Sequence, residues 1–416
     1  MNLAAPMQCL TAAEDDSALM GLASLMTTAY AGIDINPIGA RLLERAAADP
    51  KDANALMDLS TLLQIKGDPQ VAAAVQTQAL QTQQLYSLPA AGEQPGIRLL
   101  ALMTPGNLSA NTPLEFLVED SDIALDMLYV GAGLPFPESL PEHDVAFIAV
   151  CEADENRDLL RQLSDLMPFW PRPLLNDPQH ILGLSRDGAC AALKSLAGVS
   201  MPLSVRIDRQ TLEQIGRGEL PIATVLTGEK FPVIVRPVGS HAGRGLSRPD
   251  QAADLNDYLR TMAENEFYVA PFVDYRGRDG LFRKYRIVLI DGRPFACHMA
   301  ISEHWMVHYL NAGMSNSADK RSEEARWMAT FDDTFARRHE AALRSINERM
   351  GLDYLGIDCA ETRDGELLIF EVDSGAVVHA MDSVDTFPYK KPQMRKVFGA
   401  FRKMLAKSAK SGNARH

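Results

Sequence analysis

The clearest candidates for a functional site are three acidic residues near the C-terminus: Asp358, Glu371 and Asp373. The surrounding segment, residues 352–375, reads LDYLGIDCAETRDGELLIFEVDSG and predicts two strands, 354–359 and 366–372, joined by a tight turn. Side chains two apart on a strand share a face, so Glu371 and Asp373 point the same way, and pairing brings Asp358 beside them. Acids are depleted in strands, which favours a site over a surface hairpin. Such oxygen ligands select Mg²⁺ or Mn²⁺.

A second candidate is the segment 231–246, FPVIVRPVGSHAGRGL, in which a predicted strand ends at Arg236. The loop after it carries Gly239, Ser240, His241, Gly243 and Gly245, and its backbone N–H groups could close on phosphate oxygens. The segment matches neither the Walker loop nor the dinucleotide fingerprint, and a Gly-rich segment of this kind, taken alone, is more often an ordinary turn.

Three further segments lie between these motifs. Residues 267–275, FYVAPFVDY, predict an apolar strand running into a polar turn, which could offer backbone groups to a flat base while Phe272 packs nearby. A strand over 285–290 carries Arg286. Residues 304–314, HWMVHYLNAGM, hold His304, Trp305, His308, Tyr309 and Asn311, which are candidates for substrate recognition or, for the aromatic residues, simply for packing.

The order of these segments resembles the ATP-grasp superfamily, especially its branch of glutathione synthetase and ribosomal-protein glutamate ligases, over residues 174–401. The resemblance implies two α+β lobes around ATP, with a carboxylate phosphorylated to an acyl-phosphate that an amine attacks. It also implies the following roles: Asp358, Glu371 and Asp373 hold Mg²⁺ or Mn²⁺; Arg236 and the loop of Gly239, Ser240, His241, Gly243 and Gly245 cover the phosphates; Ala270, Pro271, Phe272 and Val273 line the adenine; Arg286 steadies the transferring phosphoryl group; and Asn311 lies near the metal.

The sequence departs from the family pattern at four positions. Arg236 replaces the usual strand lysine, and its planar fork still suits phosphate. Gly188 replaces the usual lysine after an Arg-Asp pair. Lys284 stands where an acid often holds the ribose, which leaves Asp274 or Asp279 as substitutes, and Asp373 replaces the usual asparagine, which makes the predicted metal site more negative.

The elements that position these residues follow from the pattern of apolar residues. We predict helices over 186–196, with Asp187 as its cap, over 251–263 and 322–350, and a basic helix over 390–410 whose charges form a solvated face. A strand over 294–301 completes the large lobe. The ATP-grasp domain then spans 186–405, with a small lobe at about 200–270 and a tail over 406–416.

Two other regions precede this domain. Residues 95–185 alternate strands (97–103, 123–129 and 145–150) with a helix over 156–166, which predicts a small α/β domain with a parallel sheet. Residues 1–90 predict three or four helices, followed by a Pro/Gly-rich linker over 88–96. Within them, one tetratricopeptide-like unit is indicated by Leu56, Leu59, Leu63, Gly67, Ala72 and Ala79. The unit is either a helical cap or dimer arm, or a peptide-binding groove.

Composition excludes several classes of protein. The 416 residues carry a formal net charge of −13, which argues against nucleic acid as a partner. No apolar run approaches the length of a membrane span, so no membrane partner is expected. Five widely spaced cysteines without a CxxC pair fit reduced thiols and a cytoplasmic location.

The sequence therefore predicts an ATP-dependent carboxylate-amine ligase that uses ATP and Mg²⁺ or Mn²⁺. Its expected partners are small-molecule, amino acid or peptide substrates, and a homodimer is possible. Two alternatives stay open: an ATP-grasp kinase that releases a stable phosphorylated product, and a nucleotide-regulated scaffold that binds a peptide through its helical segment.

Overall fold

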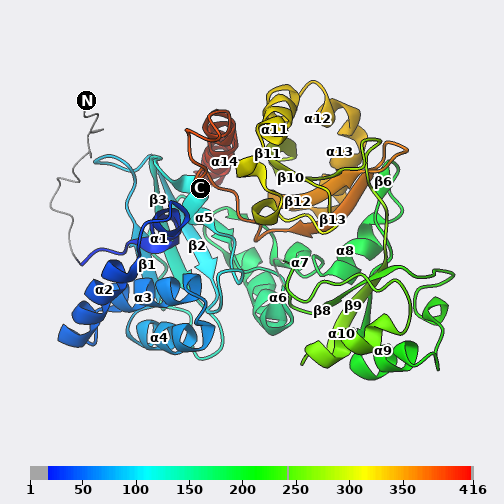
Figure 1. Ribbon diagram of the computed structural model, residues 1–416. Helices are drawn as coiled ribbons and strands as arrows, with labels where there is room; N and C mark the ends of the chain where they lie inside the picture. The colour runs from blue at the N-terminus through cyan, green and yellow to red at the C-terminus, as the bar shows by residue number, and fades with distance from the viewer. Residues whose placement is uncertain (1–16, 241–242, 414–416) are drawn as a thin grey trace, which may run out of the picture. The chain divides into compact units, whose positions relative to one another are not determined.

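The computed structural model describes residues 17–240 and 243–413. His241 of the Gly-rich loop and one of the five cysteines, Cys9, lie outside the described residues. The chain divides into two compact units, Met1–Leu88 and Pro89–His416, and every predicted site residue belongs to the second. Figure 1 labels the elements.

The first unit holds four helices, α1 (Gly21–Tyr30), α2 (Asn36–Ala48), α3 (Ala53–Ile65) and α4 (Pro69–Thr82), followed by strand β1 (Leu85–Leu88). Asp52 and Asp68 each accept a backbone hydrogen bond at the start of α3 and α4. A three-residue turn joins these two helices, and Gly67 adopts φ +84° in it. The predicted helical content is therefore found, and the tetratricopeptide assignment stays a prediction.

The second unit begins with four parallel strands in the order β3-β2-β4-β5. They are β2 (Ile97–Met103), β3 (Ile123–Tyr129), β4 (Val145–Ile148) and β5 (Leu174–Leu175). The helices of this part are α5 (Leu114–Val118), η1 (Asp154–Asn156), α6 (Arg157–Leu166), η2 (Met167–Phe169) and α7 (Pro178–Ile181). Every residue of β4 is buried, as expected for a strand covered on both faces. This is the predicted α/β part.

A small lobe follows, built on the antiparallel sheet β7-β9-β8. Its strands are β7 (Val205–Asp208), β8 (Val233–Pro237) and β9 (Glu266–Pro271), and its helices are α9 (Arg209–Gly216), η3 (Ile222–Thr224) and α10 (Asp254–Thr261). Apolar residues from all three helices and all three strands form one buried cluster, so this lobe has a core of its own.

The large lobe has a sheet in the order β11-β10-β12-β13-β6. Its strands are β6 (Val199–Ser200), β10 (Phe282–Ile290), β11 (Arg293–Ser302), β12 (Tyr354–Glu361) and β13 (Leu367–Asp373). Its helical elements are α8 (Arg186–Leu193), η4 (Tyr309–Asn311), η5 (Met314–Asn316), α11 (Ala318–Thr330), α12 (Phe335–Arg338), α13 (Glu340–Met350) and α14 (Lys390–Asn413). Figure 1 shows α11, α12 and α13 together on one side of this sheet.

The structure corrects three details of the helices. The single helix predicted over 322–350 is divided into α11, α12 and α13 by a turn after Thr330, beside which the rings of Phe331 and Phe335 stack with centroids 5.6 Å apart. The cap of α8 is Ser185, whose Oγ accepts from the Gly188 N–H, and not Asp187, which already lies in the first turn. Helix α14 continues to Asn413, beyond the predicted start of a tail at 406.

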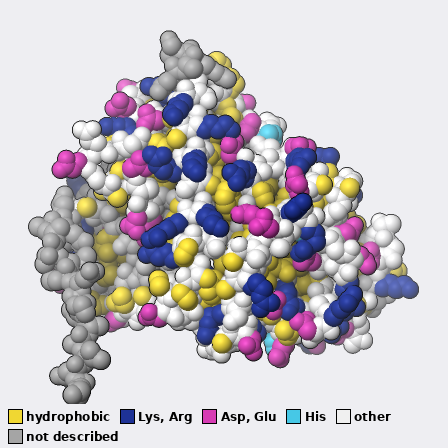
Figure 2. Space-filling model, turned by 90° about the horizontal axis from the view of Figure 1, so that it is seen from above, with side chains coloured by type: hydrophobic (Ala, Val, Ile, Leu, Met, Phe, Trp, Pro, Cys, Tyr) yellow, Lys and Arg dark blue, Asp and Glu magenta, His cyan; other side chains and the backbone are white. Residues whose placement is uncertain are grey.

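Helix α14 also does more than present a solvated face. Phe401 is fully buried, and its ring lies 6.0 Å from that of Phe147 on β4 and 5.8 Å from that of Tyr354 on β12. The helix therefore connects the α/β part to the large lobe. On the face seen in Figure 2, Lys and Arg side chains are numerous and Asp and Glu side chains lie among them.

The second unit thus has the predicted architecture, an α/β part followed by two α+β lobes. Among the described residues, no helix is both long and apolar enough to cross a bilayer. The four described cysteines, Cys151, Cys190, Cys297 and Cys359, are buried and free.

Candidate functional site

A cavity of about 440 Å³ lies between the small-lobe strands β8 and β9 and the large-lobe strands β10, β12 and β13. It brings together most of the side chains that the sequence singles out. The predicted site residues that line it are Arg236, Gly243, Ala270, Pro271, Phe272, Val273, Lys284, Arg286, Asp358, Glu371 and Asp373. Trp305 and His308, from the predicted substrate loop, line it as well.

Other predicted residues do not line this cavity. Asp274 is held by Arg276 at 2.6 Å, and the side chain of Asn311 accepts the His308 N–H at 2.9 Å. Gly239, Ser240 and Gly245 are not among the residues that line the cavity, and a Cβ on Gly245 would meet Pro237. The roles given to these residues stay predictions, and for Asp274 and Asn311 the geometry offers no contact with a ligand in the cavity.

Asp358 is the most tightly held of the three acids. Register places it opposite both Arg286 on β10 and Glu371 on β13, as the strand pattern predicts for the second pair. Arg286 donates to both of its oxygens, at 2.8 and 2.9 Å, and Lys284 Nζ lies 2.7 Å from Oδ2. Burial alone would raise the pKa of Asp358, but these two cations hold it well below its usual range. Asp358 is therefore ionised and already paired.

Glu371 and Asp373 differ in their surroundings. Glu371 Oε1 accepts from Arg186 at 2.5 Å, and although burial would raise the pKa of Glu371, the charges of Arg186 and Arg236 lower it. Asp373 accepts the Gly375 N–H at 2.8 Å. Burial, assisted by the charge of Glu371, raises the pKa of Asp373 to about 6. Within the described part of the chain, Asp373 therefore makes no ion pair, whereas Asp358 and Glu371 do.

These pairings bear on the predicted metal site. Among residues 17–240 and 243–413, no three His, Cys, Asp or Glu side chains stand together as a group that could hold a metal ion. The carboxylates have the oxygen chemistry that magnesium prefers. Asp358, however, has both oxygens engaged by cations, so the predicted three-carboxylate centre does not fit this arrangement, and metal binding stays a prediction.

Arg236 connects the Gly-rich loop to the cavity. Its Nε donates to Ser240 Oγ at 3.0 Å, another guanidinium nitrogen donates to Ser240 O, and Ser240 Oγ in turn donates to Pro237 O. Gly239 has φ +68° in this turn, which a residue with a Cβ rarely adopts. Burial, together with the nearby Arg186, lowers the pKa of Arg236 to about 10, so the side chain remains a cation at neutral pH.

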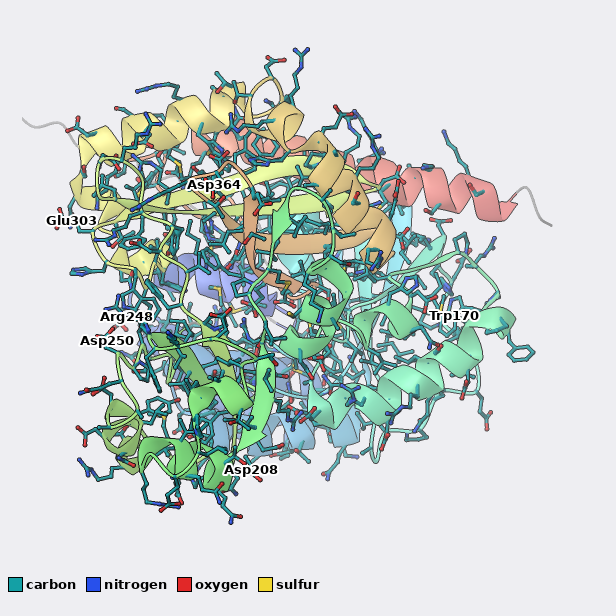
Figure 3. All side chains as sticks on the ribbon, turned by 90° about the vertical axis from the view of Figure 1, so that its right-hand side faces the viewer. Trp170, Asp208, Arg248, Asp250, Glu303 and Asp364 are labelled. Carbon is teal, nitrogen blue, oxygen red and sulfur yellow. The ribbon has the colours of Figure 1, made fainter. Side chains whose placement is uncertain are left out.

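An aromatic wall closes one side of the cavity. The ring of Phe272 meets that of Trp305 edge-on at 5.8 Å, and the guanidinium of Arg248 lies 4.8 Å from the centre of the Phe272 ring. In Figure 3, Arg248 belongs to the small lobe and Glu303, two residues before Trp305, to the large lobe. The wall is therefore shared by the two lobes and suits a flat, apolar ligand group.

Sequence reasoning missed two contributions. Arg186, at the start of α8, lines the cavity and pairs with Glu371, although the sequence analysis treated its segment only as a helix start. Leu108 and Ser109, in the loop after β2, also line it. The position of this loop in the fold accounts for its contribution. The neighbours of β2 in the sheet, β3 and β4, lie on its opposite sides, and ligands commonly bind beside the carboxyl end of a strand at which the strand order reverses in this way.

No family model and no curated protein matches this sequence. Among solved structures, the chain is similar to the D-alanine–D-alanine ligase from Bacillus anthracis complexed with ATP, at 12% identity and a TM-score of 0.45 over 77% of this chain and 99% of that one. The VanG D-Ala:D-Ser ligase from Enterococcus faecalis gives 14% identity and 0.45, over 75% and 100% of the two chains. A RimK domain protein ATP-grasp from Sphaerobacter thermophilus gives 17% and 0.41, over 74% and 99%. Likenesses this distant carry no argument about activity, so the function is inferred from the cavity itself.

Proposed function

We propose that this protein is an ATP-grasp ligase that activates a carboxylate with ATP and joins it to an amine. The observation that carries the proposal is a cavity between the sheets of the two lobes, in which cations from both lobes face three carboxylates. The order of motifs that resembles the ATP-grasp superfamily supports the same assignment. The cavity volume, about 440 Å³, falls within the range of small-molecule sites.

The cations explain how the cavity could serve phosphoryl transfer. Arg236 enters from the small lobe, while Lys284 and Arg286 enter from the large lobe. Fixed cations placed around a triphosphate stabilise the charge that develops as the terminal phosphoryl group moves. Arg286 is anchored by Asp358 and by a donated bond to Val377 O at 3.2 Å, so its position is set before any ligand arrives.

The remaining walls would hold and shield the reactants. The base would pack on the wall of Phe272 and Trp305, beside the strand end at Ala270 and Pro271. The acid to be activated would bind in the remaining part of the cavity, whose lining includes Leu108, Ser109 and Gly375. An acyl-phosphate is easily lost to water, so a site between two lobes, which shield it in part from solvent, favours attack by the amine. A divalent ion, if bound, would supply further charge neutralisation at the phosphates.

The test is a screen for ADP release with pairs of amino acids and with peptides, followed by mass analysis of each hit. We expect ADP only when a carboxylate and an amine are both present, together with a product whose mass equals their sum less one water. ADP release with a stable phosphorylated product and no amine would instead support the kinase alternative. ADP release with the correct pair but without an amide would reject the ligase.

A scaffold without catalysis makes a different prediction. Changing Asp358 and Glu371 to alanine would leave the partner binding of a scaffold intact, whereas it would abolish ADP release by a ligase.

A further inference from the structure

Lys284 and Arg286 form a cationic pair on one strand. They are two residues apart on β10, so their side chains share a face, and β12 places Asp358 directly opposite Arg286. Both cations contact the same carboxylate: Arg286 through two hydrogen bonds and Lys284 through an ion pair of 2.7 Å. All three side chains are largely buried, with side-chain exposures of 21% for each cation and 6% for Asp358.

The charges at this point do not favour a metal ion. One carboxylate faces two cations, so the cluster of Lys284, Arg286 and Asp358 carries one net positive charge. A divalent ion at Asp358 would have to displace Lys284 and then remain beside two partly desolvated cations, which repel it strongly in a medium of low dielectric constant. The same cluster attracts an anion.

The balance of the whole cavity points the same way. Among the described residues, four cationic side chains line it, those of Arg186, Arg236, Lys284 and Arg286, against the three carboxylates of Asp358, Glu371 and Asp373. One positive charge is left over before any ion enters. A triphosphate would therefore meet fixed protein cations at the position where the sequence predicts a metal ligand.

We propose that Lys284 is a built-in cation that takes the place of a divalent ion at Asp358. This inference rests on the proposed function, because it concerns the nucleotide of that same cavity. Its consequence is specific to binding: a nucleoside triphosphate binds to this protein with little help from Mg²⁺, and Lys284 is the residue responsible.

The experiment measures binding without turnover. The full chain is titrated calorimetrically with a non-hydrolysable ATP analogue, once in EDTA and once with Mg²⁺. We expect the affinity of the wild-type protein in EDTA to lie within about tenfold of that with Mg²⁺, since charge-assisted bonds from the protein already neutralise the phosphates. For the Lys284→Gln variant, the affinity with Mg²⁺ divided by the affinity in EDTA should rise about tenfold or more, because the substitution weakens mainly the binding in EDTA.

Two variants serve as controls. Lys284→Arg keeps the cation and should keep the wild-type ratio, which shows that charge rather than shape is responsible. Lys403→Gln removes an exposed lysine from α14 and should change neither affinity. If Lys284→Gln does not fold, the wild-type ratio together with that of Lys284→Arg decides the question.

The outcomes separate the inference from the function beneath it. The proposed role of Lys284 would be overturned if the wild-type protein binds the analogue only with Mg²⁺, or if folded Lys284→Gln keeps the wild-type ratio of affinities with Mg²⁺ and in EDTA. Either result would leave the proposed nucleotide site unaffected. Absence of binding by the wild-type protein in both buffers would overturn the nucleotide site and this inference together.

Discussion

Arg236 is the side chain that brings a positive charge from the small lobe into the cavity. It lines the cavity while its guanidinium group also donates to Ser240, so it joins a positive charge to the turn of the Gly-rich loop. We predict that Arg236→Met weakens binding of the ATP analogue about tenfold or more, because a charged hydrogen-bond donor is lost from a buried site. Calorimetry on the folded variant measures this.

The control for this prediction is Arg244→Met on the same loop. The Arg244 side chain is 63% exposed and pairs with Glu264 at 2.7 Å, so its removal should leave affinity nearly unchanged. Equal losses in both variants would mean that Arg236 acts through the loop alone and not through a contact with the phosphates.

At the same scale, the sequence predicts some contacts and misses others for a physical reason. The pairing of Asp358 with Glu371 follows from the alternation of side chains on two strands joined by a short turn, so it is visible in a local pattern. The pairing of Asp358 with Lys284 and Arg286 depends on the register of strands more than seventy residues apart. No local pattern contains that register, so the sequence predicts Lys284 as a nucleotide-site residue without indicating its ion pair with Asp358.

At the scale of elements, a buried carboxyl group of α3 accepts hydrogen bonds from the backbone at the start of α1. Asp58 is 1% exposed and accepts the N–H groups of Met20 and Gly21 at 2.8 and 2.9 Å. Burial raises its pKa from 3.8 to about 6, although those bonds and the charge of Arg45 oppose the shift and the charge of Asp52 adds to it. The neutral carboxyl therefore contributes stability that is complete below pH 3.8 and is lost as the pH rises through about 6.

We predict that the free energy of unfolding of the helical unit falls by up to about 3 kcal/mol between pH 4 and pH 7.5. Hydrogen exchange of amides in α1 to α4, measured in the full chain and corrected for intrinsic rates, reports this change. Asp58→Asn should remove the pH dependence, whereas Asp49→Asn, at an exposed acid, should retain it. An unchanged pH dependence in Asp58→Asn would contradict the assignment.

The start of α14 is fixed by a buried lysine. Lys390 is 3% exposed, its Nζ lies 3.0 Å from Asp382 and 3.5 Å from Glu324 on α11, and it sits 3.8 Å from the centre of the Tyr309 ring on η4. Glu324, itself fully buried, accepts bonds from the hydroxyl groups of Tyr309 and Tyr389. This cluster ties the predicted substrate loop to two helices.

We predict that Lys390→Met lowers the free energy of unfolding by about 3 to 5 kcal/mol, because it leaves two buried carboxylates without their cation. Lys391→Met, one position along and exposed, should change it by less than about 0.5 kcal/mol. Urea unfolding of both variants provides the comparison, and similar midpoints would show that the carboxylates take up protons or water instead.

Helices and strands are predicted more accurately from the sequence where the pattern of apolar residues is stronger. The strand of residues 97–103 is found at β2 with the same bounds, since a continuous apolar run bounded by turns has few alternatives. The helix predicted over 322–350 is divided by a turn after Thr330, and Phe331 and Phe335 on either side of that turn are buried, in tertiary contacts that propensity does not see.

At the scale of the whole second unit, Arg206 links the small lobe to the α/β part. On β7, it donates to both oxygens of Asp154 after β4, at 3.1 and 2.6 Å, and also to Glu266 on β9. We predict that Arg206→Met changes stability by no more than about 1 kcal/mol but raises the KM for ATP about threefold, because the lobe is held less firmly over the cavity. ADP-release kinetics measures it.

Arg217→Met is the matched control for Arg206. Arg217 pairs with Glu213 and Glu219 inside the small lobe alone, so its removal should leave KM unchanged. The same rise in KM in both variants would show that the effect comes from the charge of the lobe and not from the link.

The central claim, that ATP activates a carboxylate in this cavity, is tested most directly by following one oxygen atom. A carboxylate substrate found by the ADP-release screen is labelled with ¹⁸O in its carboxyl group, and the released inorganic phosphate is analysed by mass spectrometry. Formation and aminolysis of an acyl-phosphate transfer one labelled oxygen to each phosphate, and this is the result we expect. Amide formation with unlabelled phosphate would contradict the account.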